Sequence, residues 1–272
     1  MDNVRSEVIS KISRQYDLFQ SSMEAVDHQR KYLNWGYTVT GRESIEERQE
    51  RLCLEVFRAA EFAAEHVVVD VGFGSGEQDF LLARMFPFDR LTGFNIAARQ
   101  VLYASERARR ESLDGKLEFR NGAAEELPGI ANASVDRMMA IECAFYFDRP
   151  RFYQRAAEIL KPGGRLIVAD VTFADSLKWL TRRNEKLKRI GTRGLNRAEW
   201  EKYFRTHSVV DISKPARPGA QLAVRQILQW SRRVRGPERK EWLKMAAASQ
   251  VVALGLATGL IYYDLLVLEK AA

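Results

Sequence analysis

The sequence predicts a doubly wound α/β fold, in which a mostly parallel sheet carries helices on both faces. Two observations lead to this prediction. Short apolar runs typical of strands alternate with helical patterns at the spacing of βα units over most of the chain. The first of these runs, HVVVDVG, is rich in β-branched residues, and a glycine-rich turn follows it directly. The alternation favours parallel strands joined by crossover helices.

Each expected element follows from a local pattern. A helix is expected after Ser44, because Glu47 completes a capping box three residues further on. A second capping box, Asn196 with Glu199, predicts a helix that includes Phe204. Further helices are expected near residues 77–85, 98–111 and 150–160. Strands are expected near residues 66–72, 91–94, 117–120, 136–141, 164–171, 209–213 and 260–269.

The patterns divide the chain into three parts. Residues 1–42 are rich in aromatic side chains, and we expect them to form an N-terminal helical lid. Residues 43–215 and 260–272 contain the predicted strands and form the core. The helical pattern between the last two strands, about 45 residues, is too long for a hairpin, so residues 216–259 are expected to form a helical cap insertion. A chain of 272 residues is long enough for one such core with a cap.

The composition, 46% hydrophobic and 29% charged, is typical of soluble globular proteins. Two cysteines, Cys53 and Cys143, cannot form a disulfide framework, which favours a reducing compartment. The first residues, MDNVRSEVIS, lack the apolar stretch of a signal peptide. Met245–Tyr263 carries no charged residue but is rich in Ala and Gly, so we interpret it as a core helix followed by a strand. We expect a cytoplasmic protein, either free or peripheral at a membrane.

Basic residues gather in two segments of the second half. Residues 178–197 contain eight Lys and Arg against one acid, and residues 217–244 contain eight against two. Such fields attract anionic small molecules, an acidic partner protein or an anionic membrane surface. The alternative is that both segments are solvated helix faces without a partner.

The strongest local signal is the turn from Asp70 through Gly72 and Gly74 to Gly76, between a strand and a helix. Glycine permits positive φ and lets the backbone approach a ligand closely. The glycines alternate instead of following the GxGxxG spacing, and Asp70 would repel a pyrophosphate. A carboxylate at this place suits a cationic ligand, such as an amino group beside a sulfonium.

The segment VVVDVGFGSG resembles the first motif of class I S-adenosylmethionine-dependent methyltransferases. Within that superfamily the chain is similar to sterol and tocopherol C-methyltransferases, rebeccamycin sugar O-methyltransferase and phthiotriol O-methyltransferases. The other matching segments are NWGY, GFNIAARQV, NGAAEELP, AIECAFYF and LKPGGRLIVADV. The resemblance implies a Rossmann-like sheet with an antiparallel last strand. It also implies the cofactor S-adenosyl-L-methionine, the product S-adenosyl-L-homocysteine, and no metal.

The resemblance assigns cofactor-binding roles to particular residues. Gly72, Gly74 and Gly76 would carry the backbone around the methionine part, with Asp70 anchoring the turn. The remaining contacts that it implies are Asn95 to the ribose hydroxyls, Ile141 to the methionine end, Gln100 to the same ligand, and Ala124 and Glu125 to the adenine.

Asn95 departs from the Asp or Glu of most relatives, although an amide can serve a diol as both donor and acceptor. The alternative role for Asn95 is a helix cap. The Asp of the GDAE motif is also missing, because residues 122–125 read GAAE. Adenine recognition would therefore fall to the Ala124 backbone and to Glu125.

The reacting groups are harder to assign. Relatives often place a histidine where this chain has Phe145, so the candidate general bases are Glu142, Tyr146 and His28. Glu142 has the alternative role of a structural partner for an arginine. The aromatic residues expected to line the acceptor site are Tyr16, Tyr32, Trp35, Tyr37 and Phe145. Their alternative role is ordinary core packing.

The function expected from the resemblance is S-adenosylmethionine-dependent methylation of an oxygen of a hydrophobic natural product or lipid-like acceptor. C-methylation of a prenyl, terpenoid or quinone-like acceptor is the first alternative, and a non-methylating use of the cofactor such as cyclisation is the second. Nucleic acid is an unlikely substrate, because IECA stands where base-methylating enzymes show an NPPY-like tetrad. An acidic carrier protein holding the acceptor, or an anionic membrane, would be the partner of the basic segments.

Overall fold

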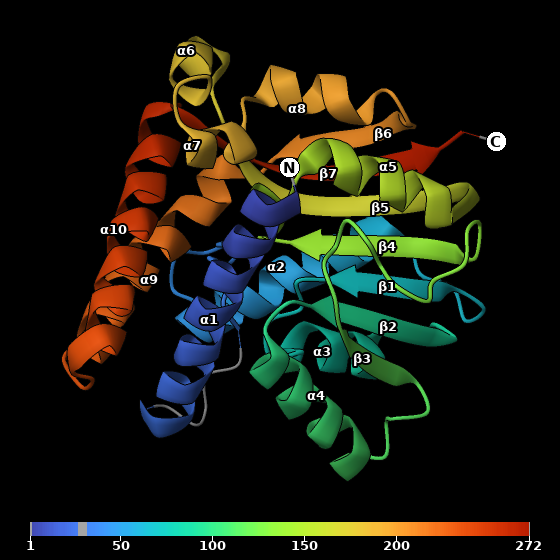
Figure 1. The fold of residues 1–272 in the computed structure, drawn as a ribbon, viewed down its shortest axis with the longest axis horizontal. Coiled ribbons are helices and arrows are strands. Elements are labelled where there is room, and N and C mark those ends of the chain that lie inside the picture. Colours follow the sequence, from blue (N-terminus) through green and yellow to red (C-terminus); the bar gives the residue numbers. More distant parts are fainter. Residues whose placement is uncertain (1, 27–31, 272) are drawn as a thin grey trace.

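The chain folds around one seven-stranded sheet in a computed structural model, which describes residues 2–26 and 32–271 (Figure 1). The strand order is β3-β2-β1-β4-β5-β7-β6. The strands are β1 (Val67–Val71), β2 (Arg90–Asn95), β3 (Leu117–Asn121), β4 (Val135–Ile141), β5 (Leu160–Phe173), β6 (Phe204–Asp211) and β7 (Ile261–Lys270). Strand β7 pairs antiparallel with both β5 and β6, while the pairs among β1 to β5 are parallel. The predicted doubly wound sheet with an antiparallel last strand is confirmed.

Helices cover both faces of this sheet, as the alternating pattern predicts. Their bounds are α1 (Asp2–Val26), α2 (Ile45–Ala60), α3 (Glu77–Met85), α4 (Ala98–Arg110), α5 (Arg149–Ile159), α6 (Lys178–Thr181), α7 (Glu185–Ile190), α8 (Arg193–Trp200), α9 (Ser213–Ser231) and α10 (Gly236–Thr258). Strand β1 shows why a run of valines is needed here. Val68 packs into the core under α2, α3 and α4, whereas Val69 packs into the core under α5 and α8. Figure 1 shows α5 and α8 in front of the sheet and α2 behind it.

The two predicted capping boxes have different outcomes. Ser44 accepts a hydrogen bond from the Glu47 amide and the Glu47 side chain accepts one from the Ser44 amide, so the first box is confirmed. The second is wrong, because α8 begins earlier, with Thr192 as its N-cap. Asn196 is buried and accepts a hydrogen bond from the phenol of Tyr153 instead of capping a helix.

The region after this helix also differs from the prediction. Phe204 begins β6, which extends to Asp211, where the sequence pattern predicts a helix up to Phe204 and a strand only from residue 209. The reason is that residues 204–211 pair with β7 along their length. Tertiary pairing therefore overrides a local helical pattern.

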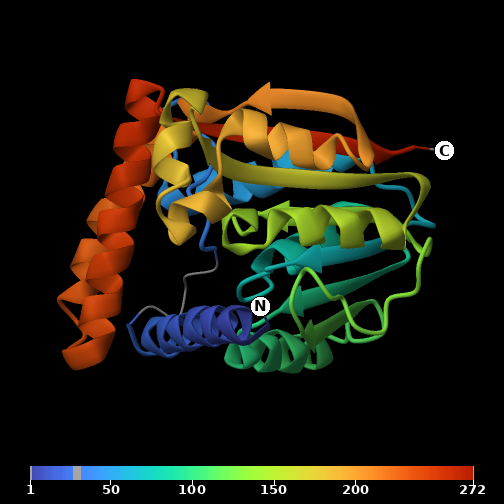
Figure 2. The same ribbon diagram turned by 45° about the horizontal axis from the view of Figure 1, so that its top comes forward.

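Helices α9 and α10 form an antiparallel hairpin between β6 and β7 and stand at one end of the sheet (Figure 2). Helix α9 begins at Ser213, three residues before the boundary expected for the cap. The hairpin has its own apolar core, which includes Ile227, Trp230 and Trp242. Phe19 of α1 joins this core, with its ring centroid 4.7 Å from that of Trp242.

The uncharged stretch Met245–Tyr263 is the second half of α10 followed by the start of β7, as predicted. Over residues 2–26 and 32–271, none of the helices combines the length and the apolar character that crossing a membrane requires.

The two basic segments form α6 to α8 and most of the α9–α10 hairpin. Part of their charge is used internally, since Arg193 contacts Asp264 and Lys244 contacts Glu241. An acidic or anionic partner for the remaining charge stays a prediction.

Candidate functional site

The candidate site lies at the edge of the sheet where the parallel strands end. Figure 1 shows the arrows of β1 and β4 pointing towards α1 and the α9–α10 hairpin. In open α/β sheets, ligands bind outside the carboxyl ends of the strands. At this edge the structure brings together the glycine-rich turn after β1, Asn95 at the end of β2 and Glu142 directly after β4.

The glycine-rich turn needs glycine for two reasons. Gly72, Gly74 and Gly76 have φ values of +71°, +60° and +81°, which side-chain-bearing residues rarely adopt. At Gly72 there is also no space, since a Cβ there would lie 2.7 Å from Cys143 Cβ. The Gly72 amide donates to the Phe94 carbonyl over 2.7 Å, which ties the turn to β2.

Two buried carboxyl groups lie beneath this turn. Asp70 accepts a 2.6 Å hydrogen bond from Gln78 Nε2, and the carboxyl group of Asp79, in the first turn of α3, interacts with that of Asp70. Burial raises the pKa of Asp70 to about 6. It raises the pKa of Asp79 well above its usual range, and the neighbouring Asp70 charge adds to that rise. The pair therefore holds a shared proton at neutral pH, and Asp79 carries it.

Sequence reasoning did not find Asp79. The signal was weak, because an acidic residue in the first turn of a helix is explained by the helix dipole alone.

The polar groups around the turn fit a cationic nucleoside donor. Among the described residues, Gln100 Nε2 is buried and has no acceptor, so it is available to a ligand. Beyond the proton that the pair shares, Asp70 Oδ1 finds no donor within the described part of the chain. A carboxylate with an unpaired oxygen favours a positively charged ligand nearby. The backbone at Gly74 is open, because among the described residues an added Cβ would meet Leu33 alone within 4 Å, at 3.6 Å.

Asn95 is engaged with its neighbours. Its Nδ2 donates to Gln100 Oε1 over 2.8 Å and to the Gly74 carbonyl over 3.2 Å, and its Oδ1 accepts from the Ala97 amide over 3.1 Å. The side chain thus joins the glycine-rich turn to the start of α4. This contact with the Ala97 amide agrees in part with the alternative role of Asn95 as a helix cap. Its contact with ribose hydroxyls stays a prediction.

The residues assigned to the adenine and methionine ends lie close to the same edge. Ala124 and Ile141 are buried in the two cores that flank the sheet. Glu125 accepts a hydrogen bond from the Asp148 amide over 2.9 Å, so its carboxylate helps to hold the start of α5. The cofactor contacts of all three residues stay predictions.

Glu142 lies directly after β4 and contacts two aromatic residues. Its Oε1 accepts a 2.7 Å hydrogen bond from the Tyr263 phenol and a 2.8 Å hydrogen bond from the Trp35 amide. Burial raises the pKa of Glu142 to about 8, despite these two donors. Tyr263 was missed by sequence reasoning, because it is 121 residues away and reaches the site only through the pairing of β7 with β5.

Aromatic rings from four segments lie around this carboxyl group: α1, the loop before α2, residues 145–146 and β7. The Trp35 ring stacks on Phe145 with centroids 6.4 Å apart, and it meets Tyr263 edge to face. The Tyr16 phenol donates to Tyr146 Oη over 3.0 Å, and the two rings are also edge to face. The structure thus gathers five of the predicted site residues in one place: Tyr16, Trp35, Glu142, Phe145 and Tyr146.

The other aromatic candidates lie elsewhere. Tyr32 is buried against α2, where its carbonyl accepts from Gln49 Nε2. Tyr37 packs on the same core, and its amide donates to the Arg48 carbonyl. The expected role of these two rings in acceptor binding stays a prediction. His28 lies outside the described residues.

Helix α1 is held against the start of α4. Ser13 Oγ donates to the Ile96 carbonyl over 2.9 Å, and the Asp17 carboxylate accepts from the Arg99 amide over 3.0 Å. Asp17 thereby caps α4 from a distant helix, since Ala97 at the N-cap provides no side-chain cap. In the described part of the chain, no group of three or more His, Cys, Asp and Glu side chains is placed to hold a metal ion.

Comparisons with known proteins agree with this geometry. Residues 69–168 match the family described as a methyltransferase domain. The erythromycin 3''-O-methyltransferase of Saccharopolyspora erythraea is 36% identical over 157 residues, which are 57% of this chain and 51% of the relative. The 27-O-demethylrifamycin SV methyltransferase of Amycolatopsis mediterranei is 28% identical over 183 residues, which are 67% and 66% of the two chains. The chain thus spans between about half and two thirds of the length of these relatives.

Solved structures share the whole fold at low identity. The [4+2]-cyclase SpnF superposes with a TM-score of 0.79 at 22% identity, covering 96% of this chain and 95% of that one. The geranyl diphosphate C-methyltransferase from Streptomyces coelicolor A3(2), in complex with S-adenosyl-L-homocysteine, gives a TM-score of 0.73 at 18% identity and covers 97% and 98% of the two chains. At these identities the likeness establishes the fold.

Proposed function

The chain belongs to the class I S-adenosylmethionine-dependent methyltransferases, and we propose that it methylates an oxygen of a hydrophobic natural product. The methyltransferase domain match and the names of the curated relatives support the reaction. The observation that carries the proposal is the position of Glu142, a partly accessible carboxyl group set among aromatic rings at the carboxyl end of β4.

The residues around the glycine-rich turn would hold the cofactor. Gly72, Gly74 and Gly76 would accommodate its methionine part, and Gln100 Nε2 would find in it the acceptor that the protein does not provide. When bound, S-adenosylmethionine supplies an electrophilic methyl group on a positively charged sulfonium. The charge of the Asp70–Asp79 pair, one unit over two carboxyl groups, would favour this cation over its neutral product.

Glu142 would accept the proton that the acceptor hydroxyl loses. Methyl transfer needs little covalent help from the protein, so positioning and the exclusion of water supply most of the acceleration. The rings of Trp35 and Phe145 would bind an apolar acceptor next to Glu142, while α1 closes the opposite side with Tyr16. A proton acceptor with a pKa of about 8 suits a hydroxyl near neutral pH.

The proposed acceptor class follows from the relatives. Two of them carry the names of enzymes that methylate erythromycin and 27-O-demethylrifamycin SV. We propose an acceptor of similar kind, a large and mainly apolar natural product with a free hydroxyl group. C-methylation is the second candidate, because aromatic faces around a single carboxyl group also suit a carbocation and the removal of its proton.

The test is a methylation assay with purified protein, deuterated S-adenosylmethionine and a panel of hydroxylated macrocyclic acceptors, followed by mass spectrometry. We expect a product that carries one labelled methyl group on oxygen, and a loss of its formation in Glu142→Gln. A label on carbon would support the second candidate. Tight binding of S-adenosylmethionine without any labelled product would contradict both and point to a non-methylating use of the cofactor.

A further inference from the structure

We propose that Tyr263 and the backbone amide of Trp35 are positioning groups, which hold Oε1 of Glu142 so that Oε2 takes the proton of the acceptor. The inference rests on the proposed function and deepens it. It assigns a role to a β7 side chain and identifies the one oxygen of the carboxyl group that remains available.

The hydrogen bonds at Glu142 are asymmetric. The Tyr263 phenol and the Trp35 amide both donate to Oε1, at 2.7 Å and 2.8 Å. An oxygen that already accepts two hydrogen bonds in a charge-assisted arrangement is the weaker proton acceptor of the two. The free electron pairs of the group are therefore concentrated on Oε2.

The backbone of Glu142 is fixed as firmly as its side chain. Its φ is +51°, a left-handed conformation that residues other than glycine rarely adopt. The Glu142 amide donates to the Ala169 carbonyl over 2.8 Å, which continues the pairing of β4 with β5 by one residue. Unusual backbone conformations persist where the surrounding structure determines them, and such positions cluster at functional sites.

Both donors are in turn held by the start of the cap. The Tyr263 amide donates to Ser213 Oγ over 2.8 Å, and the Tyr263 carbonyl accepts from the Ile212 amide over 2.7 Å. A Cβ on Gly219 of α9 would overlap the carbonyl oxygen of Trp35, so this backbone is packed directly against the helix. The α9–α10 hairpin thus fixes the two groups that fix Glu142.

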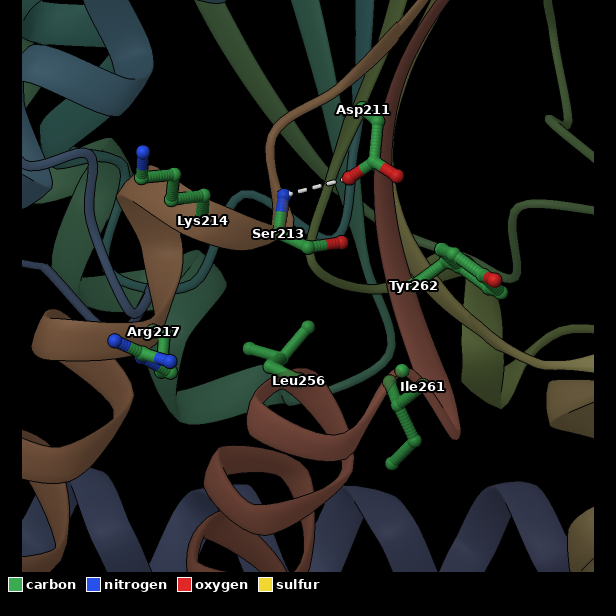
Figure 3. Close-up of a pocket in the computed structure, with 8 residues that line it drawn as sticks. Asp211, Ser213, Lys214, Arg217, Leu256, Ile261 and Tyr262 are labelled. Carbon is green, nitrogen blue, oxygen red and sulfur yellow. Dashed lines mark hydrogen bonds between the residues drawn. The ribbon is translucent and has the colours of Figure 1, made fainter.

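Ser213, Ile261 and Tyr262 line a surface pocket of about 300 Å³. Figure 3 shows how these residues lie around it. Tyr262 lines that pocket, and the guanidinium carbon of Arg193 lies 4.4 Å from the centroid of the Tyr262 ring. Because neighbouring residues of a strand point to opposite faces, Tyr262 is the matched control for Tyr263.

The pKa of Glu142 is the quantity that reports on this positioning. Burial opposes ionisation of Glu142, and the Tyr263 and Trp35 donors favour it. The other titratable groups that face Glu142 are Asp170 on β5, Tyr146 and Cys143 after β4, Tyr16 on α1 and Cys53 on α2. All of these groups are acids that are neutral or negative, so none of them compensates for the removal of one donor, and the pKa of Glu142 rises.

The first experiment compares Tyr263→Phe with Tyr262→Phe in the methylation assay across pH. In the wild type we expect kcat to rise with pH as Glu142 loses its proton. In Tyr263→Phe the midpoint of this rise should shift to higher pH by about one unit. We also expect kcat near neutral pH to fall roughly tenfold and to recover at high pH, with an unchanged KM for S-adenosylmethionine. Tyr262→Phe should keep the wild-type profile. A wild-type pH profile in Tyr263→Phe would overturn the proposal.

The second experiment does not depend on activity. Glutamate labelled with ¹³C at the side-chain carboxyl reports the pKa of Glu142 by NMR, and Glu142→Gln assigns its signal. We expect a higher pKa in Tyr263→Phe than in the wild type or Tyr262→Phe. An equal pKa of Glu142 in all three proteins would overturn the positioning role. A raised pKa in Tyr263→Phe without any methyl transfer by the wild type would support the positioning role and refute the proposed reaction.

A third protein covers the case in which Tyr263→Phe fails to fold. Fluorotyrosine at position 263 keeps the ring and makes the phenol a stronger donor. We expect it to shift the pKa of Glu142 and the pH profile in the opposite direction, towards lower pH. A shift in the same direction as that expected for Tyr263→Phe would contradict the proposal.

Discussion

The carboxyl groups of Asp70 and Asp79 interact with each other in the fully buried space beneath the glycine-rich turn. Two buried carboxyl groups that interact directly cannot both ionise without a large penalty, so the pair keeps one proton. The arrangement leaves a single negative charge below the proposed sulfonium site. Asp70 carries this charge, and Gln78 donates a hydrogen bond to its carboxylate.

We expect Asp79→Asn to flatten the dependence of stability on pH. A carboxyl group whose pKa is raised by folding contributes stability below its unfolded pKa and loses it as the pH rises through the raised value. For Asp70 this loss runs from its ordinary pKa of 3.8 up to about pH 6, and for Asp79 it continues to higher pH. The asparagine amide keeps a donor towards Asp70 and does not titrate. The variant should therefore be more stable than the wild type at pH 8, by about 1 kcal/mol or more.

Urea unfolding at pH 5 and pH 8 measures this difference. Asp114→Asn is the control, because Asp114 is an exposed acid at which no such gain is expected. If Asp79→Asn retained the full pH slope of the wild type, the shared proton would have to be abandoned.

Gly72→Ala should destabilise the protein more than Gly163→Ala does. Both glycines have positive φ, +71° and +74°, so both substitutions strain the backbone by about 1–2 kcal/mol. Only at Gly72 would the new Cβ also meet a neighbour, at 2.7 Å from Cys143 Cβ, whereas the surroundings of Gly163 are open. The difference between the two variants in urea unfolding isolates the overlap, and we expect it to exceed about 1 kcal/mol. Equal losses would show that the turn can widen.

Asp17→Ala should loosen the lid without unfolding the core. Asp17 accepts from the Arg99 amide in the first turn of α4, where the N-cap residue Ala97 provides no side-chain cap. Loss of such a cap costs about 1 kcal/mol. We expect faster hydrogen exchange in α1 and faster release of S-adenosylhomocysteine, measured by mass spectrometry and stopped-flow fluorescence. Arg14→Ala, on the exposed side of α1, is the matched control. Unchanged exchange in α1 would mean that Ser13 and Tyr16 are sufficient to hold the helix.

The sequence predicted those parts of the site that depend on contiguous residues. The turn from Asp70 to Gly76 is readable because strand, glycines and helix follow one another within a few positions. Tyr263 and Asp79 were not readable for a different reason. Tyr263 reaches Glu142 only once β7 has inserted between β5 and β6, a pairing that no local pattern specifies. The prediction of a cap at Asn196 was wrong because its side-chain oxygen accepts a hydrogen bond from the buried Tyr153.

The choice between Glu142 and Tyr146 as the proton acceptor can be decided by two substitutions. Burial raises the pKa of the Tyr146 phenol above its usual range, so its phenolate is scarce near neutral pH, whereas the pKa of Glu142 is about 8. Glu142→Gln should therefore lower kcat by about 10²–10⁴-fold. Tyr146→Phe removes the hydrogen bond with Tyr16 and should mainly raise the KM for the acceptor, with the pH profile of kcat unchanged. The reverse pattern would make the phenol the base, and the carboxyl group would then be a structural partner of Tyr263 and the Trp35 amide.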